Sequence, residues 1–331
     1  MAKIVRFHHV GGPEVLHIEE VPARPPAQGE VRVRVQAMGL NRADSMFMHG
    51  VYLEPPHLPA TLGYEAAGIV TAIGAQVDPS WLNKRVSTIP AFSPNQYGVL
   101  GTEVIVPVHA VAEYPSHLTP IEATSIWMQY LTAYGALVEF GQVQKGEFVL
   151  ITAASSSAGL AAIQTVKAEG AISIATTRTS AKRGELLALG ADHVIVTDED
   201  DLVARVNDVT GGAGVRIIFD PIAGPLLDQL AEAAAPGALI VEYGWLSKAQ
   251  TPFPLIPALQ KALSIRGYWL AEIVTHPERL ARAKSYVYDR VKTGQLKPKI
   301  AKTFRFEEVV EAYQYMESNE QIGKIVLTVG E

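Results

Sequence analysis

The feature that most constrains the fold is a regular alternation of short apolar runs and helical segments in the middle of the 331-residue chain. The apolar runs are 148–152, 171–177, 193–196, 215–220 and 238–244, and the helical segments between them are 159–169, 180–189, 200–210 and 224–234. Buried strands that alternate with helices form parallel sheets, because each helix carries the chain back to the start of the next strand. The alternation therefore predicts a doubly wound α/β domain.

The first of these strands leads into a turn of small residues, TAASSSAGL (152–160), and then into a helix. Strand, turn and helix in this order bind phosphate, because the helix dipole and the backbone N–H groups at the helix start attract anions. The usual dinucleotide pattern is G-x-G-x-x-G, and serine adopts positive φ less readily than glycine. The turn predicts pyrophosphate contacts, and the alternative is a turn that binds nothing. The residues expected to make these contacts are Ser155, Ser156, Ser157 and Ala158.

The coenzyme preference is indicated about twenty residues further on, where an NAD site places Asp or Glu to bind the ribose 2′-hydroxyl. Residues 175–183 read ATTRTSAKR and contain no acid. Arg178, Lys182 and the Thr177 hydroxyl suit a 2′-phosphate, because charge-assisted contacts to phosphate are strong. The alternative is a solvated basic helix N-terminus, which the helix dipole disfavours. The segment therefore predicts NADP(H) rather than NAD(H).

The sequence pattern before residue 120 differs from that of the α/β segment. Residues 29–37, GEVRVRVQA, alternate apolar and polar side chains, which is typical of a half-buried strand. A helix is expected from Thr119 to a glycine stop, and after the α/β segment come a long helix over 276–293 and a closing strand, KIVLTV. This order predicts that the α/β domain is inserted into a β-rich, barrel-like, antiparallel domain. The expected boundaries are 1–120 and 266–331 for the β-rich domain and 121–265 for the inserted one.

Composition and charge exclude several classes of protein. A net charge of −6 argues against a nucleic-acid partner, because phosphate binding needs a basic surface. No run approaches the ~20 apolar residues of a membrane span, and the sequence MAKIVRFHHVGG at the N-terminus lacks the apolar core of a signal peptide. The chain has no cysteine, so it can form no disulfide and no thiolate metal site. We therefore expect a cytoplasmic protein with no nucleic-acid or membrane partner.

Several segments, spread along nearly the whole chain, match segments of one known protein family in the same order. They are GLNRADSMFMHGVY (39–52), LGYEAAGIV (62–70), WMQYLTAYGAL (127–137), TAASSSAGL (152–160), FDPIAG (219–224), VEYGWLS (241–247) and IGKIVLTV (322–329). Through them the chain resembles the zinc-independent quinone oxidoreductase (zeta-crystallin-like) branch of the medium-chain dehydrogenase/reductase superfamily. The resemblance implies a Rossmann cofactor domain inserted into a GroES-like catalytic domain.

The chain departs from the zinc-dependent relatives at their metal ligands. Those relatives have Cys where Asn41 lies and His where Tyr64 lies, and Glu65 alone cannot form a tetrahedral zinc site. None of the nine histidines shows paired ligand spacing. We therefore expect no metal, and no zinc-activated alcohol chemistry.

The resemblance implies an NADP-dependent oxidoreductase that transfers hydride to a small quinone or α,β-unsaturated ketone. Such chemistry needs positioning and a donor to the oxygen that gains charge. The candidate catalytic residues are Tyr64, Tyr52 and Asn41. Tyr64 takes the vacated zinc-ligand position, and its alternative role is an aromatic filler. Asn41 is also expected, by resemblance, to contact the nicotinamide ribose.

The family implies further cofactor contacts and an assembly. Thr132, Tyr243 and Lys324 lie in segments that match cofactor-lining parts of the family. Family members pair their cofactor domains edge to edge, so we expect a homodimer. Two other functions remain open: a metal-free reductase of another enoyl or carbonyl substrate, and a low-turnover NADPH-binding structural or sensing protein.

Overall fold

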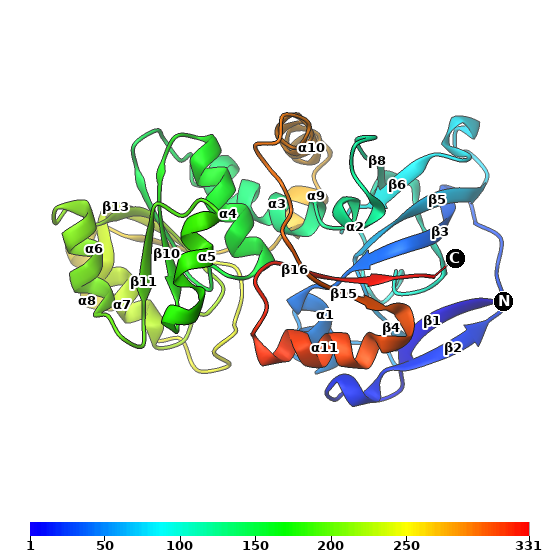
Figure 1. Ribbon diagram of the computed structural model, residues 1–331, viewed down its shortest axis with the longest axis horizontal. Helices are drawn as coiled ribbons and strands as arrows, with labels where there is room; N and C mark the ends of the chain where they lie inside the picture. The colour runs from blue at the N-terminus through cyan, green and yellow to red at the C-terminus, as the bar shows by residue number, and fades with distance from the viewer. Residues whose placement is uncertain (331) are drawn as a thin grey trace. The chain divides into compact units, whose positions relative to one another are not determined.

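The computed structural model describes residues 1–330, and its contacts divide the chain into two compact units (Figure 1). Unit 1 consists of Met1–Met128 and Pro298–Glu331, and unit 2 is Gln129–Lys297. The middle of the chain is thus inserted between the two parts of unit 1, as the sequence predicts.

The end of unit 2 differs from the predicted boundary at residue 265. The unit runs on to Lys297 because α10 (Pro277–Lys292) is bound to it through ion pairs. Arg282 of α10 pairs with Glu139 at 2.5 Å, and Arg290 pairs with Glu169 at 2.8 Å. The local pattern of residue types does not reveal such contacts, because they join segments more than a hundred residues apart.

Unit 2 contains a parallel sheet of six strands. The strands are β9 (Phe148–Ile151), β10 (Ile172–Thr177), β11 (His193–Val196), β12 (Val215–Asp220), β13 (Ala234–Glu242) and β14 (Ser264–Gly267). Their order is β11-β10-β9-β12-β13-β14, and every pairing is parallel. The order reverses between β9 and β12, which is the topological switch point where doubly wound folds bind ligands. The predicted doubly wound Rossmann sheet is confirmed.

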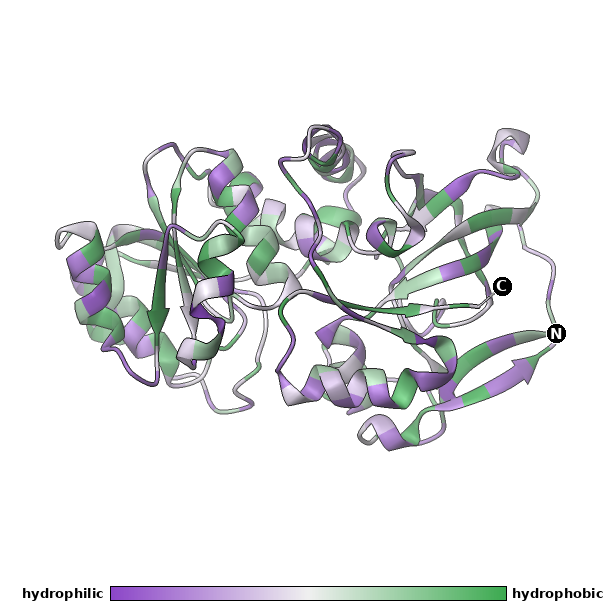
Figure 2. Ribbon diagram, in the orientation of Figure 1, coloured by the Kyte–Doolittle hydropathy of each residue, from purple (hydrophilic) through white to green (hydrophobic). Residues whose placement is uncertain are grey.

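Helices cover both faces of this sheet. They are α4 (Ser157–Ala168), α5 (Arg183–Ala188), α6 (Leu202–Thr210), α7 (Leu226–Ala233) and α8 (Leu255–Lys261), followed by α9 (Ala271–Val274) and α10. Figure 1 shows α4 and α5 on one side of the sheet and α6, α7 and α8 on the other. In Figure 2 the central strands are mostly hydrophobic, whereas the helices carry both hydrophobic and hydrophilic residues. One apolar cluster of strand and helix residues, including Leu150, Ile218 and Leu230, is fully buried.

Unit 1 contains two sheets. Its strands are β1 (Ala2–Phe7), β2 (His17–Val21), β3 (Glu30–Gly39), β4 (Ala60–Thr61), β5 (Glu65–Ile73), β6 (Arg85–Thr88), β7 (Glu103–Pro107), β8 (Val111–Glu113), β15 (Ile300–Arg305) and β16 (Lys324–Thr328). One sheet has the order β2-β1-β4 and the other β15-β16-β3-β5-β6-β8, with β7 pairing with β3. The second sheet is mixed rather than purely antiparallel, because β15 and β16 are parallel. A crossover helix, α11 (Val309–Ser318), joins them, and a helical crossover is what parallel neighbours require.

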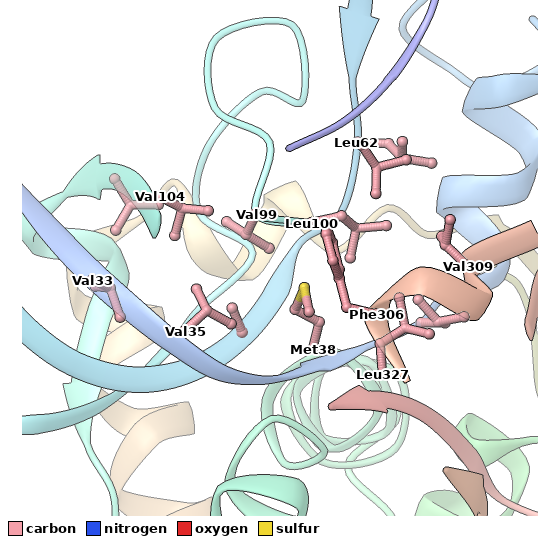
Figure 3. Packing of buried hydrophobic residues seen from close by; sticks show 14 of the residues in the cluster. Val33, Val35, Met38, Leu62, Val99, Leu100, Val104, Phe306, Val309 and Leu327 are labelled. Atoms are coloured by element: carbon pink, nitrogen blue, oxygen red, sulfur yellow. The ribbon is translucent and has the colours of Figure 1, made fainter. Parts of the chain in front are cut away.

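The core of unit 1 is built from both ends of the chain. Val33, Val35 and Met38 of β3 pack in one buried cluster with Phe306 and Leu327 from the C-terminal part (Figure 3). This apolar packing explains why the two sequence-distant parts of the unit form one body, since burying apolar area is the main favourable term in folding.

The helix predicted to start at Thr119 is broken. Thr119 does cap α2 (Pro120–Ala123), since its side chain accepts from the N–H of Glu122, but a new helix α3 begins at Trp127 and runs to Ala133. A π-helical segment, η4 (Tyr134–Phe140), continues α3. The remaining elements are α1 (Arg42–Met48) and short 3₁₀ turns at Pro13–Val15, Pro79–Trp81, Val108–Ala110, Ser180–Lys182 and Phe306–Glu308. None of the helices in residues 1–330 has the length and apolar character that crossing a membrane requires.

A buried ion pair joins these elements. Lys324, the first residue of β16, places Nζ 2.5 Å from Oε2 of Glu65, the first residue of β5, and neither side chain is exposed. Oε1 of Glu65 accepts from the N–H groups of Trp127 (3.0 Å) and Met128 (2.9 Å), which start α3. Glu65 therefore links the C-terminal strand, a central strand and the helix that follows the break.

We expect Lys324→Met to lower the free energy of unfolding by about 3–5 kcal/mol, because it leaves the Glu65 carboxylate buried without its cation. Chemical denaturation followed by fluorescence gives the measurement. Lys302→Met is the matched control, since Lys302 is an exposed residue of β15 whose ammonium lies over the rings of Phe304 and Tyr315. Equal losses in the two variants would contradict the assigned role of the ion pair.

Candidate functional site

The small-residue turn lies at the switch point of unit 2 and contains a strained residue. Ala153 adopts a left-handed conformation with φ 45°, which favours glycine and costs energy in other residues. The backbone N–H of Ala154 donates to the carbonyl of Thr176 at 3.2 Å, which fixes the turn to the neighbouring strand β10. The turn thus adopts its shape without the usual glycines because an alanine takes the left-handed position.

The serines of the turn differ in their positions and hydrogen bonds. Ser156 is the N-cap of α4, and its Oγ accepts from the N–H of Gly159 at 3.0 Å. The Ser156 oxygen thus caps the helix as an acceptor, and its hydroxyl hydrogen can still be donated to a phosphate. At Gly159 a Cβ atom would lie 2.6 Å from the Cα of Ala154, so only glycine allows this close approach of helix and turn. Ser157 and Ala158 are the first two residues of α4, where N–H groups face outward from a helix.

One of the predicted cations lies at this turn. Nζ of Lys182, at the end of a 3₁₀ turn after β10, donates to Oγ of Ser155 at 3.2 Å. Arg178 is exposed and directly follows β10. Thr177 is buried, and its hydroxyl donates to the carbonyl of Thr179 at 3.3 Å. The structure thus brings Lys182 and Ser155 together and leaves Arg178 on the surface at the carboxyl end of β10.

Two acids at the carboxyl edge of the sheet were missed by the sequence reasoning. Asp220 ends β12 and accepts from the Thr152 hydroxyl and, at 2.6 Å, from the N–H of Ala223. Glu242 ends β13 and lies directly beside Asp220 in the strand register. Burial and the Asp220 carboxylate raise the pKa of Glu242 to about 9, so Glu242 is neutral at pH 7. The sequence does contain a signal for them, because each of two successive apolar strands ends in an acidic residue.

Tyr243 follows Glu242 and stacks on Phe219, with ring centroids 4.0 Å apart. Burial and the neighbouring Asp220 and Glu242 raise its pKa. Tyr243 thus lies at the same carboxyl edge as the turn. Thr132, the remaining predicted cofactor residue of unit 2, is buried in α3.

Unit 1 contains a cluster of aromatic side chains around Tyr64. The Tyr64 ring stacks on Phe92 with centroids 5.9 Å apart, and Phe92 contacts Tyr97 edge to face at 6.0 Å. The Tyr64 carbonyl accepts from the Thr88 hydroxyl at 2.8 Å, which fixes the start of β5.

The hydroxyl of Tyr64 is paired with that of Tyr52. Burial, chiefly, and also the hydrogen bond to Tyr52 raise the pKa of Tyr64. Tyr64 therefore keeps its proton at neutral pH.

The predicted residues Asn41 and Lys324 meet in a buried polar cluster. Nζ of Lys324 donates to Oδ1 of Asn41 at 2.6 Å, and Nδ2 of Asn41 donates to Glu65 at 3.2 Å. The backbone N–H of Asn41 donates to Asp44 at 2.8 Å. Burial raises the pKa of Asp44 to about 7. Asn41 is buried, and its side chain is oriented by Lys324, by Glu65 and by the carbonyl of Gly39, which accepts from Nδ2 at 3.3 Å.

Within residues 1–330 no group of three or more His, Asp or Glu side chains is placed to hold a metal ion. The positions matching the zinc ligands of other family branches hold Asn41 and Tyr64, whose contacts are described above. That the protein works without a metal stays a prediction.

Two family models match the chain. Residues 27–116 match the alcohol dehydrogenase GroES-like domain, and residues 158–285 match the domain described as zinc-binding dehydrogenase. The first lies within unit 1 and the second within unit 2.

Individual proteins match over almost the full length. Quinone oxidoreductase 1 of Escherichia coli is 30% identical, over 99% of both chains. A 2-haloacrylate reductase from Burkholderia sp. is 28% identical, over 99% of this chain and 98% of the relative. The crystal structure of E. coli quinone oxidoreductase complexed with NADPH superposes with a TM-score of 0.92 at 30% identity and covers 98% of this chain and 99% of that one. The chain belongs to the zinc-independent quinone oxidoreductase branch of the medium-chain dehydrogenase/reductase superfamily.

Proposed function

We propose that this protein is an NADPH-dependent reductase that transfers hydride to a quinone or an α,β-unsaturated ketone without a metal. The observation that carries the proposal is the contact between Lys182 and Ser155, which joins a cation to the phosphate-binding turn at the switch point. The similar E. coli quinone oxidoreductase, whose crystal structure holds NADPH, supports the same coenzyme. We place the protein in the cytoplasm, since a chain without cysteine suits a reducing compartment.

The residues at the switch point fit NADPH. The N–H groups of Ser157 and Ala158 at the start of α4 suit the pyrophosphate, and only glycine fits at position 159 beside the turn. Lys182 and Arg178 are the cations for the 2′-phosphate, and the segment has no acid to bind an unphosphorylated ribose. Thr177, Thr132 and Tyr243 from unit 2, and Asn41 and Lys324 from unit 1, are the further residues that we propose for the coenzyme.

When bound, NADPH supplies the hydride. The protein's own contribution is to donate a proton or hydrogen bond to the acceptor oxygen, which gains negative charge. Tyr52 is the donor in this proposal, and the neighbouring Tyr64 hydroxyl, which keeps its proton, stabilises the charge that develops on the Tyr52 oxygen. Asn41, held by Lys324, is a positioning residue.

The choice between quinones and enones belongs to this proposal, and two alternatives remain. The first is a metal-free reductase of another enoyl or carbonyl substrate, and a relative named 2-haloacrylate reductase supports including acrylates among these. The second alternative, and the third function under consideration, is that of an NADPH-binding protein with little turnover. Steady-state oxidation of NADPH with a panel of quinones, enones and acrylates distinguishes them, and tight NADPH binding without turnover on any acceptor would favour the third function.

The tyrosine pair generates the first kinetic prediction. Tyr52→Phe should lower kcat by about 100- to 1,000-fold, the loss seen when a donor to a developing oxyanion is removed. Tyr64→Phe should lower kcat less, because it acts through Tyr52. The dissociation constant for NADPH should stay within twofold in both variants.

The matched control is Tyr97→Phe. Tyr97 belongs to the same aromatic cluster, but its hydroxyl donates to Glu30 at 3.1 Å. A Tyr52→Phe enzyme with a kcat close to that of Tyr97→Phe would remove Tyr52 from the mechanism.

Coenzyme selectivity is the second prediction. A hydrogen bond to a charged group contributes about 1.5–3 kcal/mol, so Arg178→Ala and Lys182→Ala should each weaken NADPH binding by about 10- to 150-fold. NADH lacks the 2′-phosphate and should lose less in both variants. Titration calorimetry with both coenzymes provides the measurement.

Arg205→Ala is the control for the loss of one positive charge, since Arg205 of α6 pairs with Asp208 on the surface. Equal losses for NADPH and NADH in Arg178→Ala would mean that Arg178 supports the fold or the shared adenosine. A wild-type protein that prefers NADH would contradict the coenzyme assignment.

We also propose a homodimer formed through unit 2. Among residues 1–330, seven of the fourteen exposed large hydrophobic side chains lie between Trp245 and Trp269. They lie in α8 and in the segments that flank α8 and β14 along the chain, and β14 is an edge strand of the six-stranded sheet. An uncovered apolar edge invites association, and a second copy presents the same edge.

Light scattering at micromolar concentration should therefore give twice the chain mass of 35.7 kDa. Leu259→Lys with Ile256→Lys should give a monomer, because both side chains are exposed on α8. Leu187→Lys, which places the same charge on an exposed leucine of α5, should leave the dimer intact. A monomer mass for the wild type would refute the dimer.

A further inference from the structure

A fixed carboxylate lies beside the tyrosine pair of unit 1. Glu54 follows Tyr52 by two residues, and its Oε1 accepts two hydrogen bonds from another loop. The Ser93 hydroxyl donates at 2.5 Å and Nδ2 of Asn95 donates at 3.0 Å. Two donors on one oxygen hold the half-buried Glu54 side chain in place.

The same loop brings this charge to Tyr64. Phe92 precedes Ser93 and stacks on the Tyr64 ring. Burial is the main cause that raises the pKa of Tyr64, and the charge of Glu54 adds to it. The fixed Glu54 carboxylate therefore acts on the tyrosine hydroxyls.

No cation in the adjoining loops offsets this charge. Residues 51–64 and 90–98 contain neither Lys nor Arg, and their one basic side chain is the exposed His57. Two cations elsewhere in the unit have carboxylate partners of their own: Arg24 pairs with Glu30 at 2.6 Å, and Lys324 pairs with Glu65. A carboxylate on an acceptor molecule would thus find repulsion and no ion-pair partner here.

We propose that Glu54 is a specificity-determining residue that restricts the enzyme to uncharged acceptors and disfavours those that carry a carboxylate. The inference rests on the proposed function, in which the tyrosine pair donates to the acceptor oxygen. Like charges separated by several ångströms near a protein surface repel measurably, and salt weakens the repulsion.

The test compares two acceptors that differ in one charge, benzalacetone and its para-carboxylate, by NADPH oxidation. The wild type should have the larger kcat/KM for the uncharged ketone. In Glu54→Gln the ratio of kcat/KM for the carboxylate to that for the ketone should rise by about 3- to 10-fold, as expected for one partly screened charge. Glutamine keeps the Oε1 acceptor that Ser93 and Asn95 bind, so the variant removes the charge and preserves the contact.

Glu20→Gln is the control, because it removes the same charge from an exposed position on β2 and should leave the ratio unchanged. A measurement on the wild type needs no variant: raising the salt concentration should increase the same ratio. A Glu54→Gln ratio within twofold of the wild type, or a wild type that reduces the carboxylate as well as the ketone, would overturn the role of Glu54. Absence of NADPH oxidation with both acceptors and with quinones would instead reject the proposed function, and the inference with it.

Discussion

The Glu65 carboxylate is the group on which most of unit 1 depends. Burying a charge is expensive unless donors satisfy it, and Glu65 has four: Lys324, Asn41 and the N–H groups of Trp127 and Met128. These donors come from the last strand, from the residue before α1 and from the first turn of α3. One side chain therefore fixes the C-terminal strand, orients a proposed cofactor residue and sets where α3 begins, since a carboxylate stabilises a helix N-terminus.

The elements that depend on local pattern could be predicted from the sequence. The apolar runs at 148–152 and 215–220 correspond to β9 and β12, because strand burial is visible as composition. The break between α2 and α3 could not be predicted, because it depends on Glu65, which is some sixty residues away. The parallel pairing of β15 with β16 and the attachment of α10 to unit 2 could not be predicted either, because both depend on contacts between segments that are distant in the sequence.

The candidate site shows the same division. Residue types alone indicated Lys182 and the serine turn, and the structure adds that Lys182 contacts Ser155 whereas the Ser156 hydroxyl caps the helix. Asn41 and Lys324 came from resemblance, and their mutual hydrogen bond gives the buried Lys324 side chain a second polar partner beside Glu65. Nothing in the sequence tells that Glu54 and Ser93 meet, because two irregular loops bring them together.

Charge also limits what the carboxyl edge of the Rossmann sheet can do. Two ionised acids, Asp220 and Glu242, next to the turn that we propose for the pyrophosphate would repel an anionic ligand. Keeping Glu242 neutral, with its pKa raised to about 9, leaves the single charge of Asp220, which the Thr152 hydroxyl and the Ala223 N–H stabilise. The folded protein then binds a proton that the unfolded chain releases near its ordinary pKa of 4.5. The contribution of Glu242 to the free energy of unfolding therefore falls as the pH rises from that value towards 9, so neutrality at this edge is maintained at a cost in stability that grows with pH.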